Sequence, residues 1–312
     1  DATENGSVVN DSIFKDPNIT SLFGALTRLR GQRENRPFNK WIDNGIFLRQ
    51  SYYLGRLDTL HKGLPEMEIH PTNAIAHNTS IRQRKYIFFK NESDQEGAFP
   101  YNEAIRVQDT TKVTTISNEF TYAFYLRNKS LLKNEAKLNV GFQNDLIWYA
   151  DSLTDDFFQN SMVKGDLQYK FSDKVNINVL ANQIVLGRHI GDFLYQASAD
   201  VQLSEQIGKI SFGAYSQNKS PEMIFNRAST TYHQWNNDFS KTKTQNLWFG
   251  YQNKKIGFSG KAEYFLISDH LYFKEIDNPN NNDRLEKIIE GAQYDLLNLL
   301  KITANQNFRF GK

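Results

Sequence analysis

The sequence predicts an all-β protein, an antiparallel up-and-down transmembrane β-barrel with a short irregular segment at its N-terminus. Apolar and polar residues alternate with a period of two, many alternating segments reach ten residues, and short and longer connections follow one another in turn. Within Lys255–Ile267, for example, Ile256 and Tyr264 fall on one face, while Lys261 and Glu263 fall on the other. Such a strand has one apolar face and one charged face.

An apolar face of this kind is compatible with two architectures. A soluble sandwich packs it against a second sheet, whereas a transmembrane barrel turns it toward lipid and keeps the polar face for a water-filled interior. Strand length favours the barrel, because a tilted membrane strand needs about 9–11 residues and a typical soluble strand has about 5–6. The deciding observation is whether residues such as Val179 and Phe258 meet lipid or an opposing sheet.

Composition excludes several classes of protein. The chain has 312 residues, no Cys and a formal net charge of +2, so it has no disulfide framework and no strong field for nucleic acid. Its mean hydropathy is −0.61, and no apolar run approaches the roughly 20 residues of a membrane helix. Barrel strands alternate, so a low mean hydropathy is compatible with them.

The chain divides into an N-terminal segment, residues 1–40, and a region of strands and loops, residues 41–312. The first is polar and irregular, with one short helix expected around Ser21–Arg30. We interpret it as an entry segment, with a disordered or periplasmic tail as the alternative. The second contains about eleven alternating segments. They lie near residues 46–55, 78–90, 113–126, 137–148, 163–171, 175–185, 193–203, 209–215, 246–252, 255–267 and 300–310.

The connections between these segments differ in length in a regular order. The tight turns are Ser172–Lys174, Ser204–Gln206 and Asn253–Lys255. Short periplasmic turns alternating with longer external loops are typical of bacterial outer-membrane barrels. The longer links are expected at Ala150–Phe157, Gly187–Asp192, Asn218–Lys241 and Asp269–Ile289.

Charged residues on the polar faces are the strongest candidates for function. Rings of charge set selectivity in pores, whereas the alternative is that opposite charges pair across strands and stabilise a filled barrel. Both signs are mixed, which favours pairing or a weakly selective pore. The candidates that would face the lumen are Glu119, Arg127, Lys137, Asp145, Lys164, Asp166, Lys170, Asp200, Lys209, Lys261, Glu263, Lys301 and Arg309.

Aromatic residues gather on the apolar faces, many of them where strands approach turns. An interfacial girdle of aromatic residues predicts this arrangement, and ordinary aromatic strand propensity is the alternative. The candidates that would face lipid or form the girdle are Phe124, Trp148, Tyr169, Phe171, Phe249, Tyr251, Phe258, Tyr264, Phe308 and Phe310.

The long link Asn218–Lys241 is rich in aromatic residues, among them Phe225 and Trp235. Such a loop would bind a glycan, fold inward as a constriction, contact a partner or pack on the mouth of the barrel.

We find no catalytic, metal-binding or cofactor-binding constellation, since the six His residues are scattered and no phosphate-binding glycine motif occurs. The protein is therefore not expected to be an enzyme.

Several stretches of the sequence together resemble the β-barrel porin family of Bacteroidetes. The resemblance extends from about Arg33 to Lys312, and it implies an outer-membrane barrel without a catalytic motif. Members of this family are longer, so the chain is expected to be part of a barrel. The stretches are Phe47–Gly55, Lys85–Glu92, Gly97–Pro100, Gly213–Pro221, Asp238–Leu247 and Lys255–Tyr264.

These observations lead to two functional hypotheses, both of which place the protein in the bilayer of the bacterial outer membrane. In the first, the barrel is a porin that lets small hydrophilic solutes diffuse through it, without cofactor or reaction. In the second, it is a structural subunit of a larger outer-membrane secretion, assembly or uptake complex, with other outer-membrane proteins as partners. A nucleic-acid partner is not expected in either case.

Overall fold

A computed structural model describes residues 38–57, 69–91, 106–128, 131–152, 154–231, 233–277 and 287–308. The expected helix at Ser21–Arg30 lies outside these described residues, as do Arg309 and Phe310. The first strand begins at Phe38, shortly before the boundary expected at residue 40.

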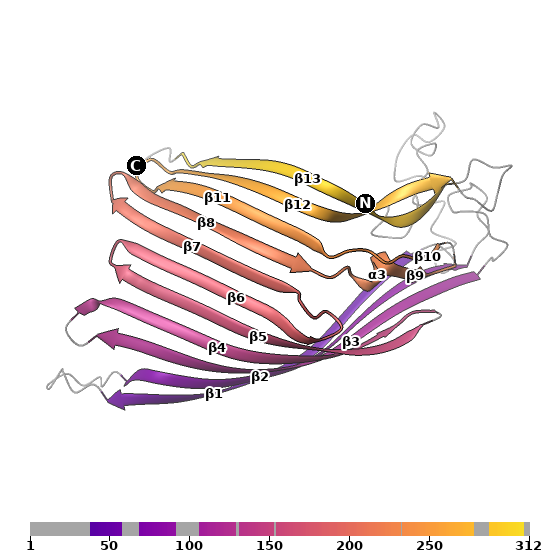
Figure 1. The fold of residues 1–312 in the computed structure, drawn as a ribbon, viewed down its shortest axis with the longest axis horizontal. Coiled ribbons are helices and arrows are strands. Elements are labelled where there is room, and N and C mark those ends of the chain that lie inside the picture. Colours follow the sequence, from indigo (N-terminus) through magenta and orange to yellow (C-terminus); the bar gives the residue numbers. More distant parts are fainter. Residues whose placement is uncertain are drawn as a thin grey trace.

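Eleven strands form one antiparallel sheet in which neighbours in sequence are neighbours in space (Figure 1). This meander confirms the predicted up-and-down order of eleven strands. The alternation of β-branched and aromatic residues with polar residues suits a pleated sheet whose two faces meet different media. The strands are β1 (Phe38–Leu57), β2 (Ile69–Asn91), β3 (Arg106–Asn128), β4 (Leu131–Ala150), β5 (Asp155–Ser172), β6 (Val175–Gly187), β7 (Phe193–Ser204), β8 (Gly208–Lys219), β11 (Thr242–Asn253), β12 (Phe258–Asp277) and β13 (Lys287–Gln306).

The sheet is open between its first and last strands. Among the described residues, β1 pairs with β2 alone and β13 pairs with β12 alone. A strand edge in hydrocarbon leaves backbone donors and acceptors unsatisfied, which costs several kcal/mol for each group. Both edges therefore need a backbone partner in the membrane.

Several strands are longer than the sequence pattern indicated. The link expected at Asp269–Ile289 is mostly strand, because β12 continues to Asp277 and β13 already starts at Lys287. Likewise, β5 begins at Asp155, within the link expected at Ala150–Phe157. Hydrogen bonding across strands extends these elements beyond the point where the alternation of apolar residues fades.

The short turns lie together at one end of the sheet, on the left in Figure 1. The turn between β7 and β8 ends at Gly208, whose φ of 103° is in the region that favours glycine. A Cβ there would lie 2.2 Å from the carbonyl oxygen of Gln252 on the neighbouring strand. This turn therefore depends on glycine for both its backbone conformation and its close contact with β11.

Between β8 and β11 lies the remaining secondary structure of the described residues. It contains α3 (Met223–Asn226) and a small hairpin made of β9 (Arg227–Ser229) and β10 (Gln234–Asn236). In the described parts of the chain, no helix has the length and apolar character needed to cross a membrane.

A conventional hydrophobic core is absent from the described residues. Not one large side chain among them is completely buried, and many large apolar side chains are exposed, such as Leu247 at 63% and Ile302 at 73%. The main sheet is a single layer, and the other sheet found in the described residues is the two-stranded hairpin β9–β10. The sandwich alternative is therefore wrong, because no second sheet covers the apolar face.

Candidate functional site

One loop identifies the concave face of the sheet. Residues 220–241, which we call the inner loop, reach Asp109 on β3 through Thr231 and Gly291 on β13 through Asn237. In the sheet order, β4 through β12 separate these two strands. A single loop touches both strands only because the sheet curves around it, at the end away from the short turns (Figure 1). The side chains that alternate with Asp109 along β3, among them Glu119, therefore point to the concave side.

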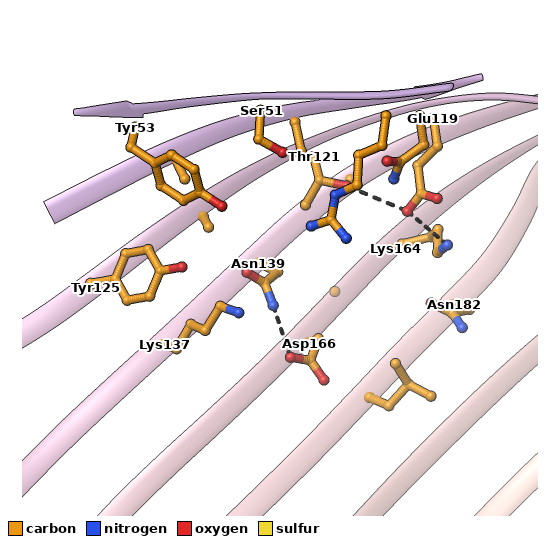
Figure 2. Close-up of a pocket in the computed structure, with 18 residues that line it drawn as sticks. Ser51, Tyr53, Glu119, Thr121, Tyr125, Lys137, Asn139, Lys164, Asp166 and Asn182 are labelled. Carbon is orange, nitrogen blue, oxygen red and sulfur yellow. Dashed lines mark hydrogen bonds and ion pairs between the residues drawn. The ribbon is translucent and has the colours of Figure 1, made fainter. Parts of the chain in front are cut away.

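A polar hollow of about 250 Å³ lies on this inner wall (Figure 2). Lys164 on β5 donates to Glu119 on β3 at 2.8 Å and to Gln143 on β4 at 3.2 Å. Beside this network, the side-chain amide of Asn139 donates to Asp166 at 3.0 Å. Four predicted lumen residues share this hollow: Glu119, Lys137, Lys164 and Asp166.

A second hollow, of about 430 Å³, continues the wall toward the short turns. Its lining includes the predicted residues Lys137, Lys170 and Asp200. The ammonium group of Lys137 lies 5.5 Å from the centre of the Tyr125 ring, within the range of a cation–π contact. The wall therefore offers aromatic as well as charged surface to a solute.

The other predicted lumen residues lie in separate groups along the same face. Lys209 lies 3.3 Å from Asp200, and Glu263 on β12 lies 2.7 Å from Lys261 and 3.9 Å from Lys301. Asp145 accepts hydrogen bonds from the Gln143 amide at 2.9 and 3.0 Å. Arg127 belongs to β3, but its side chain lies outside the described residues, as does the whole of Arg309.

Opposite charges on the inner wall compensate one another. Glu119 with Lys164, Asp200 with Lys209, and Glu263 with Lys261 each form an ion pair across or along the strands. Partly exposed pairs of this kind contribute about 0–1 kcal/mol each to stability. Their larger effect is on the electrostatic field in the lumen. Where these pairs lie, the field is neither mainly positive nor mainly negative.

The first hollow is also lined by Arg49, Tyr53 and Asn182, which were not among the predicted lumen residues. Arg49 and Tyr53 belong to β1, whose inner face also carries Trp41 and Phe47, so that both faces of this strand appear apolar. The period of two, followed from Arg49 to Tyr53, places both residues on the inner face and would have predicted their position.

The inner loop is anchored to β3 by a buried carboxylate. Asp109 is 7% exposed and accepts hydrogen bonds from the backbone N–H of Thr231 at 3.0 and 3.1 Å. The Thr231 hydroxyl donates to the same carboxylate at 2.9 Å. Hydrogen bonds to a charged group are worth about 1.5–3 kcal/mol. Asp109 was not among the predicted site residues, because the apolar alternation of β3 is weak before Val113.

The other side of the inner loop rests on β12 and β13. The ring of Phe225 stacks on Phe273 at 4.6 Å between centroids, and Trp235 lies 6.0 Å from the same ring. The side chain of Gln293 donates to the backbone carbonyl of Ser240 at 2.8 Å. Four roles were possible for this loop. Because it folds inward, the structure favours a constriction of the passage or packing on the mouth of the barrel.

Two histidines at this end of the sheet are partly buried. Burial lowers the pKa of His233 on the inner loop, and the nearby carboxylate of Asp109 acts in the opposite direction. Burial also lowers the pKa of His189 in the link between β6 and β7, which hydrogen-bonds to Asn160 at 3.1 Å. Both side chains are therefore held mainly as neutral imidazoles at neutral pH.

The convex face carries the predicted girdle residues. Trp148, Phe171, Phe249 and Tyr264 are all more than a third exposed, and so are Phe124 and Phe308. Tyr169 contacts Phe171, and Tyr251 contacts Phe258, with ring centroids 6.1 and 6.3 Å apart near the short turns. Trp148 lies near the other end, beside Phe157. A soluble monomer rarely exposes an apolar surface of this extent.

A comparison with protein families identifies the chain. Residues 1–312 match the family described as "Putative porin". The chain belongs to this porin family. The match accounts for the polar concave wall and the exposed convex face, and it confirms the resemblance noted in the sequence. This porin-like barrel resides in the bacterial outer membrane, where lipid surrounds its apolar face.

Solved structures similar to this porin-family chain are receptors with very low sequence identity to it. A mutant of the ferric enterobactin receptor PfeA from Pseudomonas aeruginosa superposes with a TM-score of 0.51 and 9% identity, covering 88% of this chain and 47% of the receptor. The siderophore receptors PirA from P. aeruginosa and from Acinetobacter baumannii give TM-scores of 0.49 and 0.48, with 9% and 11% identity. These matches cover 86% and 88% of this chain and 53% and 51% of those receptors.

The chain thus spans about half the length of these receptors. The likeness to PfeA concerns the fold, a curved meander of long strands. No curated protein matches the sequence.

Proposed function

We propose that the barrel to which this chain contributes is a diffusion pore for small hydrophilic solutes. The observation that carries the proposal is that the two faces of one sheet suit two different media. Its convex face exposes large apolar side chains, while its concave face holds hydrogen-bonded, charge-compensated polar groups. A water-filled passage needs such a wall, and a bilayer needs such an exterior.

The residues support a weakly selective pore of this kind. Among the described residues, the ion pairs of the inner wall combine both signs and form no uniform ring of one charge, which a strongly ion-selective filter requires. Movement of solutes along such a wall needs no reaction and no cofactor. The polar hollows around Lys137 offer exchangeable hydrogen-bond partners to a passing hydrated solute.

Planar-bilayer recording with the full-length protein tests this function. Stepwise ion currents are expected, with a reversal potential near that of a non-selective pore. The substitution Glu119→Gln leaves Lys164 without its carboxylate partner, so the permeability ratio should shift toward anions by up to about fivefold, the equivalent of ~1 kcal/mol. A barrel that folds in the bilayer without conducting would contradict the proposal.

The second candidate is a structural barrel subunit of a larger outer-membrane assembly. The observation that favours it is the inner loop, which crosses the concave face at one end and narrows the passage there. The same loop lies on the inside, so its aromatic residues do not offer an external docking surface. A silent barrel that co-purifies at fixed stoichiometry with other envelope proteins would support this candidate.

A further inference from the structure

Three lysines lie close together on the convex, lipid-facing side of β1, β2 and β3. The register places Lys85 directly opposite Lys112, and both alternate with inward residues such as Arg84 and Val113. Lys40 on β1 lies diagonally next to Lys85, since Lys40 pairs with Ile87. Directly opposite residues on one face have Cβ atoms about 4.5–5.5 Å apart, and diagonal neighbours about 7–8 Å. We call these three residues the basic cluster.

The basic cluster is uncompensated within the described part of the chain. Like charges directly opposite each other destabilise a sheet. None of the three lysines forms an ion pair with a described residue, in contrast to Lys274 farther along the convex face, which pairs with Glu290 at 2.9 Å. The nearest outward acid among the described residues is Asp155, which pairs with Ala150, the partner of Lys112. The repulsion between these lysines therefore favours the binding of an anion that neutralises their charge.

Outward residues in register on β1, β2 and β3 form rows across the sheet. From the basic cluster toward the short turns, these rows change from polar to apolar. The row one step farther from the loops consists of Asn44, Gln83 and Thr114, with the Gln83 amide donating to the Thr114 hydroxyl at 3.4 Å. The next row consists of three isoleucines in register, Ile46, Ile81 and Ile116. Two residues of strand span about 6.6–6.8 Å, so the isoleucine row lies roughly 13 Å from Lys85 and Lys112 along the strands, and roughly 20 Å from Lys40.

An aromatic residue marks the same level as the polar row. Trp148 on β4 pairs with Thr114 and is 37% exposed on the convex face. Tryptophan prefers the boundary between hydrocarbon and headgroups. The basic cluster therefore lies at headgroup level, on the side of the long loops.

The three rows follow the order of groups in a phosphorylated lipid: a phosphate, then polar linkages, then an acyl chain. We propose that Lys40, Lys85 and Lys112 bind the phosphate of an outer-leaflet lipid headgroup, with the chain of that lipid lying along Ile46, Ile81 and Ile116. The anion removes the repulsion between Lys85 and Lys112. A free phosphate ion would leave the polar and apolar rows unused, so the site favours a lipid.

Lipid binding to the purified full-length protein tests the site. The probe is bisphosphorylated lipid A, titrated in detergent and followed by native mass spectrometry, with dephosphorylated lipid A as the ligand control. A surface lysine near an anionic headgroup contributes about fivefold in affinity, so K85Q/K112Q should bind roughly 25-fold more weakly. Lys243→Gln is the matched protein control, because Lys243 is also exposed and outward near the long loops but stands alone.

The same variants separate the site from a general effect on folding. Without lipid, K85Q/K112Q should unfold at a higher temperature than the wild type, because the repulsion is gone. Added lipid A should raise the unfolding temperature of the wild type and of K243Q but not of the double variant. Equal lipid binding by K85Q/K112Q and the wild type, equal binding of dephosphorylated lipid, or failure of K85Q/K112Q to fold would overturn the proposal. Conductance does not enter these measurements, so they are independent of the proposed pore.

Discussion

At the scale of single residues, Asp109 determines where the inner loop docks. Its buried carboxylate accepts three hydrogen bonds from Thr231, and no comparable set of polar contacts holds the described part of the loop to β3. Removing the charge weakens each of these bonds, while an amide of the same size keeps the packing.

We therefore expect Asp109→Asn to weaken docking of the loop by about 1.5–3 kcal/mol. The released loop should be cut by protease within residues 220–241, and single-channel conductance should become larger or noisier. Thr231→Val should have a smaller effect because it keeps the backbone donor. Unchanged protease resistance and conductance in Asp109→Asn would show that the carboxylate does not hold the loop.

His233 makes docking of the same loop sensitive to pH. Burial lowers its pKa below the ordinary value of 6.5, and Asp109 is the charged group that opposes this shift. The docked loop therefore binds fewer protons than the released loop. The stabilisation is fully present above about pH 6.5 and is lost as the pH falls through the lowered pKa.

We expect the loop to become more protease-sensitive as the pH is lowered from 7.5 to 5. His233→Gln should remove most of this dependence on pH. His189 also has a lowered pKa, so His189→Gln is the control that reports any contribution from the link between β6 and β7. Identical pH profiles for the wild type and His233→Gln would rule out this role.

At the scale of elements, the inner wall depends on close contacts between strands β7, β8 and β11. A Cβ on Gly213 would lie 2.7 Å from the carbonyl oxygen of Ala197 and 2.8 Å from the ring of Trp248. Trp248 in turn lies under the ammonium group of Lys261, 4.9 Å from the ring centre. Glycine at this position lets the indole lie flat against the wall.

Gly213→Ala should destabilise the barrel by about 1–3 kcal/mol, because it forces the indole or the backbone to move. Gly165→Ala is the matched control, since a Cβ there would meet nothing closer than the carbonyl oxygen of Ala181 at 3.8 Å. Urea unfolding in detergent, followed by heat-modifiable gel migration, measures both. Equal midpoints for the two variants would contradict this account of the wall.

At the scale of the whole molecule, the two ends of the sheet face different compartments. Short turns such as Asp173–Lys174 lie at one end, and the links that include Thr154 and His189 lie at the other. In outer-membrane barrels the short turns face the periplasm and the longer loops face outward. The inner loop and the basic cluster then belong to the outer end.

Single-cysteine labelling tests this orientation, and the chain has no natural Cys to interfere. A membrane-impermeant maleimide should label Thr154→Cys and His189→Cys on intact cells. It should reach Asp173→Cys and Lys254→Cys only after the outer membrane has been opened. The reverse pattern would mean that the orientation is inverted.

Much of the architecture could be predicted from local pattern. The period of two along β5, β7 and β12 places Lys164, Asp200 and Glu263 on one face without reference to any neighbour. The short turns fix which strands are adjacent, because antiparallel neighbours joined by two to four residues have no other partner within reach. The number and order of the strands therefore follow from the sequence.

Other features depend on contacts between residues far apart in the chain. The ends of β12 and β13 are held by cross-strand pairing after the alternation of apolar residues weakens, so their length was underestimated. Thr231 meets Asp109 across 122 positions of sequence, and no local signal indicates that the link between β8 and β11 folds inward.

The long strands with one apolar and one charged face follow from the amino-acid sequence alone, because side-chain direction in a strand alternates with every residue. The folded chain was needed to show that the sheet curves as a single layer, with none of the described residues packed over its apolar side. It was also needed to show the register, which sets Lys85 against Lys112 and places Ile46, Ile81 and Ile116 in one row. Register and curvature arise from hydrogen bonds and packing between strands, and these are not encoded in any one strand.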